Sequence, residues 1–231
     1  MKRLFAAGTA MLLAMGAASA AHAEMVTIDD FQTVATVSDN TTGDGANSTT
    51  GLITVDGRTF LRTLSVNQIE NPDPNDLRQR SSLNVGLGRM FLNNDFDSNA
   101  IFTASYNIDS LVDDFDGASQ LMLTIDGFDG AFDVPLTIKV ELGDYEFSQT
   151  FTGPISNPDV DAIFNLPALA DSGNELRISF WAGTGSDMKF LPIRIDIGIG
   201  NEEPVPEPAM IGLLGLGVAA VGFGRRRKVT A

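Results

Sequence analysis

The chain contains no cysteine and a single histidine, His22, among its 231 residues. Without cysteine, an exported domain is held together by its hydrophobic core and not by disulfides. His22 lies in an N-terminal segment that we expect to be removed, so the mature chain has no histidine. This excludes Ser-His-Asp and Cys-His nucleophiles, zinc sites with Cys or His ligands, and haem with an axial histidine. Carboxylate chemistry remains open, because a glycosidase needs two Asp or Glu residues at a set separation.

Basic residues are scarce in the part of the chain between its two ends. Residues 24–204 carry nine basic and 29 acidic side chains, which gives a net charge of −20. Such a domain repels nucleic acid and anionic lipid, and no basic stripe offsets the repulsion. Nucleic acid is therefore excluded as a partner, and divalent cations, neutral polymers and cationic proteins remain.

Residues 24–204 also lack long helical patterns, and apolar residues alternate with polar ones instead. The clearest case is a predicted hairpin of 136–142 and 145–151 joined by Gly143-Asp144, a pair suited to a two-residue turn. A closing strand is predicted over 191–199, where Pro192 indicates an edge or the beginning of the strand.

The same alternation predicts further strands, separated by turn-rich pieces. The strands are 26–31, 33–38, 52–55, 59–66, 83–87, 100–108, 120–126 and 175–181, and the turn-rich pieces are 39–51, 70–76, 113–117 and 156–161. About ten short strands without a βαβ rhythm favour one all-β domain over 24–204, an antiparallel two-sheet sandwich of jelly-roll type. A single β-barrel is the alternative.

The N-terminus has the features of a signal peptide over residues 1–23. Lys2 and Arg3 precede an apolar run, and an A-x-A site ends at Ala23. We therefore expect export through the Sec machinery and cleavage by signal peptidase between Ala23 and Glu24.

The C-terminus, residues 205–231, combines three features in a fixed order. Pro206-Glu207-Pro208 is followed by an uncharged stretch, 209–224, and then by the basic residues Arg225, Arg226, Arg227 and Lys228. As a helix the uncharged stretch would span about 24 Å, somewhat less than the hydrocarbon layer of about 30 Å. We expect a short transmembrane helix in the inner membrane, with the basic cluster on the cytoplasmic side.

This order of motif, helix and basic end resembles the PEP-CTERM sorting signal of bacteria, in which Pro206, Glu207 and Pro208 correspond to the recognised motif. The resemblance covers the tail alone. It implies that exosortase sorts and processes the protein, and that the product belongs to the cell envelope, cell surface or extracellular matrix, in association with exopolysaccharide or biofilm. Because such tails follow unrelated domains, the resemblance does not say what residues 24–204 bind.

Asp95, Asp97 and Asn99 place oxygen atoms at alternate positions, as in loops that wrap calcium. Ala100 and Tyr106 stand where an EF-hand has glycine and glutamate, so an EF-hand is rejected and a looser calcium site or a plain polar turn remains. Two Asp- and Gly-rich pieces, 113–117 and 126–130, suit cations in the same way, but Asp-Gly pairs are first of all turn chemistry.

Trp181, the single tryptophan, ends the predicted strand 175–181. Alternation puts it on the polar face with Arg177 and Ser179, away from the predicted core, where it could stack on a sugar ring together with Tyr106 or Tyr145. We expect a non-enzymatic protein; a carbohydrate-binding module is the alternative, and a carboxylate-based glycosidase or lyase is a weaker one.

Overall fold

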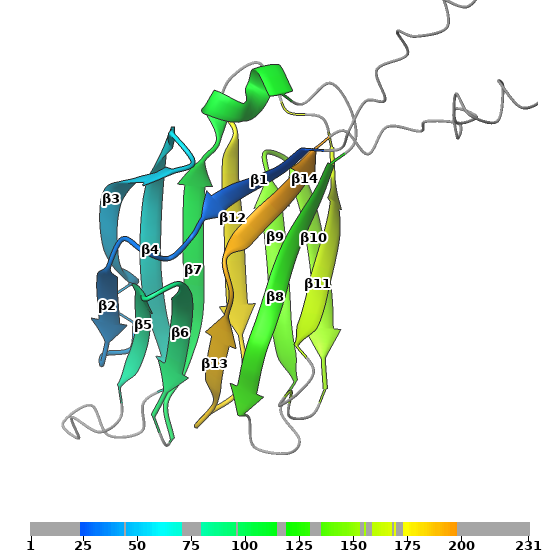
Figure 1. The fold of residues 1–231 in the computed structure, drawn as a ribbon. Helices are drawn as coiled ribbons and strands as arrows, with labels where there is room; N and C mark the ends of the chain where they lie inside the picture. The colour runs from blue at the N-terminus through cyan, green and yellow to red at the C-terminus, as the bar shows by residue number, and fades with distance from the viewer. Residues whose placement is uncertain are drawn as a thin grey trace, which may run out of the picture. The chain divides into compact units, whose positions relative to one another are not determined.

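The computed structural model describes residues 24–43, 45–70, 80–95, 97–114, 119–129, 135–152, 155, 159–167, 169 and 173–197. These residues form fourteen β-strands and one short 3₁₀ helix, η1 (Asp109–Asp114). The strands lie in two facing layers, and residues Ala23–Gly200 group into one compact unit (Figure 1).

The larger layer, sheet A, has eight strands in the order β1-β14-β8-β13-β6-β5-β2, with β11 on the other side of β8. Its strands are β1 (Glu24–Asp29), β2 (Ala35–Asp39), β5 (Ser81–Gly86), β6 (Arg89–Asn94), β8 (Ser119–Asp129), β11 (Val160–Leu166), β13 (Asp187–Phe190) and β14 (Ile193–Ile197). Both β13 and β14 pair with the long strand β8, so Leu191 and Pro192 interrupt what is nearly one strand.

The smaller layer, sheet B, has six strands in the order β10-β9-β12-β7-β4-β3. They are β3 (Asn47–Val55), β4 (Arg58–Glu70), β7 (Asn99–Asn107), β9 (Leu136–Leu142), β10 (Tyr145–Phe151) and β12 (Glu175–Trp181). Neighbouring strands in this sheet run antiparallel. The all-β two-sheet sandwich is thus confirmed. The chain crosses repeatedly from one sheet to the other, as a jelly roll requires, but the jelly-roll type stays a prediction.

Two hairpins show how local sequence fixes strand register. The predicted hairpin of β9 and β10 is confirmed with its bounds, and Gly143 has a φ of +57° in the turn. Strands β3 and β4 meet at Asp56-Gly57, where both residues have positive φ, as a type I′ turn demands. Asp tolerates this conformation better than most residues with a side chain, and Gly adopts it without strain.

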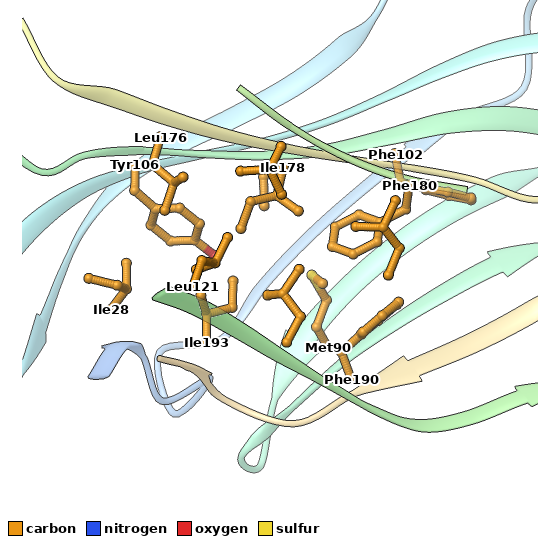
Figure 2. Close-up of a cluster of buried hydrophobic side chains, with 14 of the residues drawn as sticks. Ile28, Met90, Phe102, Tyr106, Leu121, Leu176, Ile178, Phe180, Phe190 and Ile193 are labelled. Atoms are coloured by element: carbon orange, nitrogen blue, oxygen red, sulfur yellow. The ribbon is translucent and has the colours of Figure 1, made fainter. Parts of the chain in front are cut away.

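The core lies between the sheets and is built from every second residue of the strands. On β9 and β12 the inward positions are buried and the outward ones are not. Figure 2 shows Phe102 and Phe180 of sheet B across from Met90 and Phe190 of sheet A. The rings of Phe180 and Phe190 are 4.6 Å apart between centroids, so they join the two layers directly.

Several sequence predictions need correction. Strands β6, β11 and β13 were not predicted, β3 begins inside the predicted turn 39–51, and β11 begins inside the predicted turn 156–161. The Asp-Gly piece at 126–130 is also no simple turn, because Asp126–Asp129 belong to β8. There the Asp126 carboxylate lies 2.9 Å from both Arg89 and Lys189, so it forms ion pairs with side chains of two other strands, β6 and β13.

Candidate functional site: the outer face of sheet B

Trp181 lies on the outer face of sheet B, as the alternation of β12 predicts. Its side chain is 51% exposed, whereas Phe180 beside it is fully buried. Register places Ile101 of β7 on one side of Trp181 and Thr137 of β9 on the other. The aromatic ring therefore lies between an apolar and a hydroxyl neighbour on an open sheet surface.

The outward side chains of sheet B are dominated by serine and threonine, and we call this surface the hydroxyl face. The serines and threonines that form it are Ser48, Thr50, Thr54, Thr59, Thr63, Ser65, Thr103, Ser105, Thr137, Ser148, Thr150 and Ser179. They line up across neighbouring strands, and several pairs are hydrogen-bonded: 3.0 Å for Thr50–Thr63, 3.1 Å for Thr103–Ser179 and 3.2 Å for Thr137–Thr150. Each hydroxyl keeps further donor or acceptor capacity toward a ligand.

Charges on the hydroxyl face neutralise one another. The ammonium of Lys139 lies 2.9 Å from Glu146 and 3.0 Å from Glu141, and these hydrogen bonds raise the pKa of Lys139. Arg177 lies 3.2 Å from Glu175. In a domain of net charge −20 this surface is nearly uncharged, so it suits a neutral ligand better than a cation.

Chemically, the hydroxyl face offers one exposed aromatic ring on a sheet surface that is rich in groups that both donate and accept hydrogen bonds. A tryptophan ring presents a large apolar surface with a polar N–H at its edge. Sugars combine apolar C–H faces with hydroxyl groups, so both parts of a sugar find partners here. Within the described strands this surface is one side of a six-stranded sheet, which suits an extended polymer.

The two tyrosines do not join this surface. Tyr106 is fully buried, and its hydroxyl donates a 3.0 Å hydrogen bond to Asp29. Tyr145 is exposed but pairs with Leu142, whose side chain faces inward, so it lies on the inner side of the β10 edge. The predicted platform of several aromatic residues is therefore reduced to Trp181.

A buried polar network connects the sheets behind this surface. Arg62 of β4 is 4% exposed and donates to Asp29 of β1 at 2.9 Å and to the Thr33 carbonyl at 2.8 Å. Burial raises the pKa of Asp29, although its contacts with Arg62, the Phe31 N–H and Tyr106 lower it. Burial and the nearby Asp29 also raise the pKa of Tyr106 well above its ordinary value. Arg62 shares the inward side of β4 with apolar residues, and this break in the alternation is the one sequence signal of a buried polar contact.

A small pocket lies between β3 and the residues that precede β2, on the inner side of sheet B. Its volume is about 140 Å³, and Arg62 and Leu64 line it together with Thr33–Ala35 and Thr49–Ile53. Ligand pockets for small molecules usually measure about 300–1,000 Å³. This pocket is thus too small for most cofactors.

Of the predicted calcium ligands, Asp95 and Asp97 lie in the connection between β6 and β7, and Asn99 is the first residue of β7. Asp95 already accepts a 3.2 Å hydrogen bond from the Arg80 N–H, Asp97 is exposed with a φ of +64°, and Asn99 is 6% exposed. The Oδ1 atom of Asn99 is buried without a hydrogen-bond partner. Among the described residues no three Asp, Glu or His side chains converge as metal ligands. The calcium site therefore stays a prediction.

The described strands define the class of the domain as an antiparallel β-sandwich with one exposed aromatic on a neutral sheet face. The tail then gives the more specific assignment, because residues 204–228 match the PEP-CTERM protein-sorting motif. This motif marks exported proteins that exosortase sorts to the cell surface. The chain therefore carries a PEP-CTERM sorting signal, as its sequence predicts.

No curated protein matches the chain. Among solved structures, TmCBM61 in complex with beta-1,4-galactotriose has 10% identity and a TM-score of 0.36 over 74% of this chain and 92% of its own. A family 29 carbohydrate-binding module from Piromyces equi has 14% identity and a TM-score of 0.33 over 68% and 95%. The family 11 module from Clostridium thermocellum, bound to a beta-1,3-1,4-mixed-linked tetrasaccharide, has 12% identity and a TM-score of 0.32 over 77% of this chain and 98% of its own. With TM-scores below 0.5 and such low identities, these similarities establish neither the fold nor the ligand of this chain.

The sorting residues themselves lie outside the described part of the chain. This holds for Ala23 of the signal-peptide site, for Pro206, Glu207 and Pro208, for the helix predicted over 209–224, and for the basic residues that follow it. Within the described ranges, no helix is long and apolar enough to cross a membrane.

Proposed function

We propose that this chain is a non-enzymatic protein of the bacterial cell envelope or extracellular matrix, which exosortase processes and which binds extracellular polysaccharide through its hydroxyl face. The sorting motif at residues 204–228 supports the delivery. The half-exposed Trp181 on a neutral, hydroxyl-rich sheet supports the binding. The sorting motif and the hydroxyl face together support an association with exopolysaccharide or biofilm, because they bring a surface suited to sugars to the outside of the cell.

The carboxylates argue against a glycosidase. Such an enzyme needs two carboxyl groups on either side of the bond to be broken, with the pKa of the acid raised. The pKa of Asp29 is raised, but its side chain is fully buried and is held by Arg62 and Tyr106. It cannot reach a glycosidic oxygen, so its role is structural.

Exosortase processing is tested in the native host. Replacing Glu207 with alanine should leave the protein uncleaved in the inner membrane, because it removes the central residue of the sorting motif. Fractionation and intact mass of the released protein measure this. A second variant, Glu203→Ala, removes a neighbouring carboxylate outside the matched residues and should be processed normally. Unchanged mass and location for Glu207→Ala would refute the sorting proposal.

Polysaccharide binding is tested by affinity electrophoresis in gels containing neutral or acidic polysaccharides. Trp181→Ala should weaken retardation by a neutral polymer at least about tenfold, which corresponds to 1.4 kcal/mol. Trp181→Phe should keep part of it, because a smaller ring still stacks. Tyr145→Ala removes an equally exposed aromatic from outside the hydroxyl face and serves as the control. Equal retardation of all variants would refute binding through Trp181, and a wild type that no polysaccharide retards would be an inert matrix protein.

Calcium binding at Asp95, Asp97 and Asn99 has a separate test. Screening of the acidic domain should make calcium and magnesium equivalent, whereas an irregular oxygen cage prefers calcium. We expect a calcium-selective rise in the melting temperature that Asp97→Asn abolishes. Asparagine is chosen because it tolerates the positive φ of residue 97. Equal melting curves with both ions would show a solvated turn.

A further inference from the structure

Strand β3 forms one edge of sheet B, and its free side is unusual. It pairs with β4 along its length, and no described strand pairs with its other side. Its nine residues, Asn47–Val55, include no charged residue and no proline. Natural proteins normally protect sheet edges with charges, prolines, bulges or short strands, because an open edge pairs with other chains. None of these devices is present on β3.

The two-residue turn between β3 and β4 determines which backbone N–H and C=O groups of β3 point away from β4. In a hairpin with a two-residue turn, the residues next to the turn, Val55 and Arg58, form a hydrogen-bonded pair. Pairs then alternate, so the backbone groups of Thr50, Leu52 and Thr54 point away from β4. A Cβ atom added to Gly51 would meet no heavy atom within 4 Å, so the inner side of the strand, where the small pocket lies, is open at this point.

On its inner side β3 faces residues 33–35 across the small pocket, and on its outer side it is exposed. Asn47 reaches β2 through a 3.0 Å hydrogen bond to the Ser38 carbonyl, so the free stretch begins at Ser48. The 140 Å³ pocket runs along the inner side of 49–53. Leu52 is 68% exposed on the outer side. The edge thus combines unpaired backbone groups with exposed apolar surface, whose burial against a second chain would be favourable.

Three other sheet edges, those of β10, β11 and β2, differ from β3. Strand β10 carries Glu146, and Gln149 donates a 2.6 Å hydrogen bond to the Ile163 carbonyl of β11, which joins these two edges. Strand β11 carries Asp161. Strand β2 has five residues and ends at Asp39, whose carboxylate accepts the Gln68 N–H at 3.0 Å. Charge, short length or a cross-link protects each of them.

We propose that β3 is a self-association edge, where it pairs antiparallel with β3 of a second copy of this chain. A domain of net charge −20 repels its own copies over most of its surface, and uncharged β3 is where two copies approach with the least repulsion. The strand is also its own complement, since an antiparallel pair about a two-fold axis is isologous. Sheet B of both copies then becomes one sheet, and the two hydroxyl faces form one continuous surface.

Analytical ultracentrifugation of the processed protein released by the native host tests this pairing. The wild type should dimerise at micromolar concentration. Thr50→Pro removes an N–H that points to the free side and leaves the β3–β4 bonds intact, and Thr50→Lys places like charges close together at the new interface. Each should raise the dimer dissociation constant by at least about tenfold. Thr63→Lys makes the same change on β4, opposite Thr50, and should leave the dimer in place.

Amide hydrogen exchange gives a residue-level readout of the same dimer. The amides of Thr50, Leu52 and Thr54 should be protected in the wild type at high concentration and should exchange fast after dilution. A wild type that stays monomeric, or a dimer that keeps its affinity in both Thr50 variants, would overturn the proposal. Trp181→Ala should dimerise normally. The dimer can therefore be tested independently of polysaccharide binding, whatever the outcome of the binding experiment.

Discussion

Replacing Arg62 with methionine is expected to destabilise the folded domain by about 3–5 kcal/mol at neutral pH. The substitution leaves Asp29 fully buried without the guanidinium that lies 2.9 Å away, and an uncompensated buried charge is costly. It also removes the hydrogen bond to the Thr33 carbonyl. Urea denaturation followed by Trp181 fluorescence and circular dichroism would measure the loss.

The effect of Arg62→Met should also depend on pH. The pKa of Asp29 is raised in the folded domain, so between the ordinary value of about 3.9 and the raised value the folded state binds more protons than the unfolded state. Stability from this group is therefore highest below that window and falls as the pH rises through it. Without Arg62 the folded pKa rises further, so the window widens upward and the destabilisation should be larger at about pH 8 than at about pH 5.

The double variant Asp29→Asn, Arg62→Met provides the control for this interpretation. Removing both charges should recover part of the lost stability, because no unpaired buried charge is left. The difference from the wild type should then vary much less with pH than in the single variant. A single variant with equal destabilisation at both pH values, or a double variant no better than the single, would contradict the account of the network.

Truncating Phe180 to alanine is the second change with a large expected effect, about 3–5 kcal/mol. Its ring is fully buried and lies 4.6 Å from that of Phe190, so the truncation opens a cavity between the two sheets. Phe91→Ala removes the same ring from the outer side of β6, where it is 40% exposed, and should cost much less. Similar denaturation midpoints for both variants would show that Phe180 does not hold the sheets together.

The sequence determined those features that depend on neighbouring residues. Alternation and the Gly143-Asp144 turn predicted the β9–β10 hairpin with its bounds, because the period of two and the turn are both local. Alternation also placed Trp181 on the outward side of β12. The sorting tail was readable because its three features follow one another directly in the chain.

The sequence pattern does not predict strands β6 and β11, and the reason is physical. Each carries an apolar residue on its outward side, Phe91 and Ile163, which blurs the contrast between the two faces. What makes them strands is pairing with β5, β13 and β8, which lie elsewhere in the chain. Pairing of this kind is decided by the whole fold, since β-propensity depends strongly on the neighbours.

The site itself was decided by tertiary structure. Each strand of sheet B has its own outward serines and threonines, but only the order β10-β9-β12-β7-β4-β3 aligned them into one face and put Ile101 and Thr137 beside Trp181. Likewise, Asp29, Arg62 and Tyr106 met inside the sandwich from three distant strands. Alternation tells which way a side chain points, and only the packing of strands that are remote in sequence decides what it meets there.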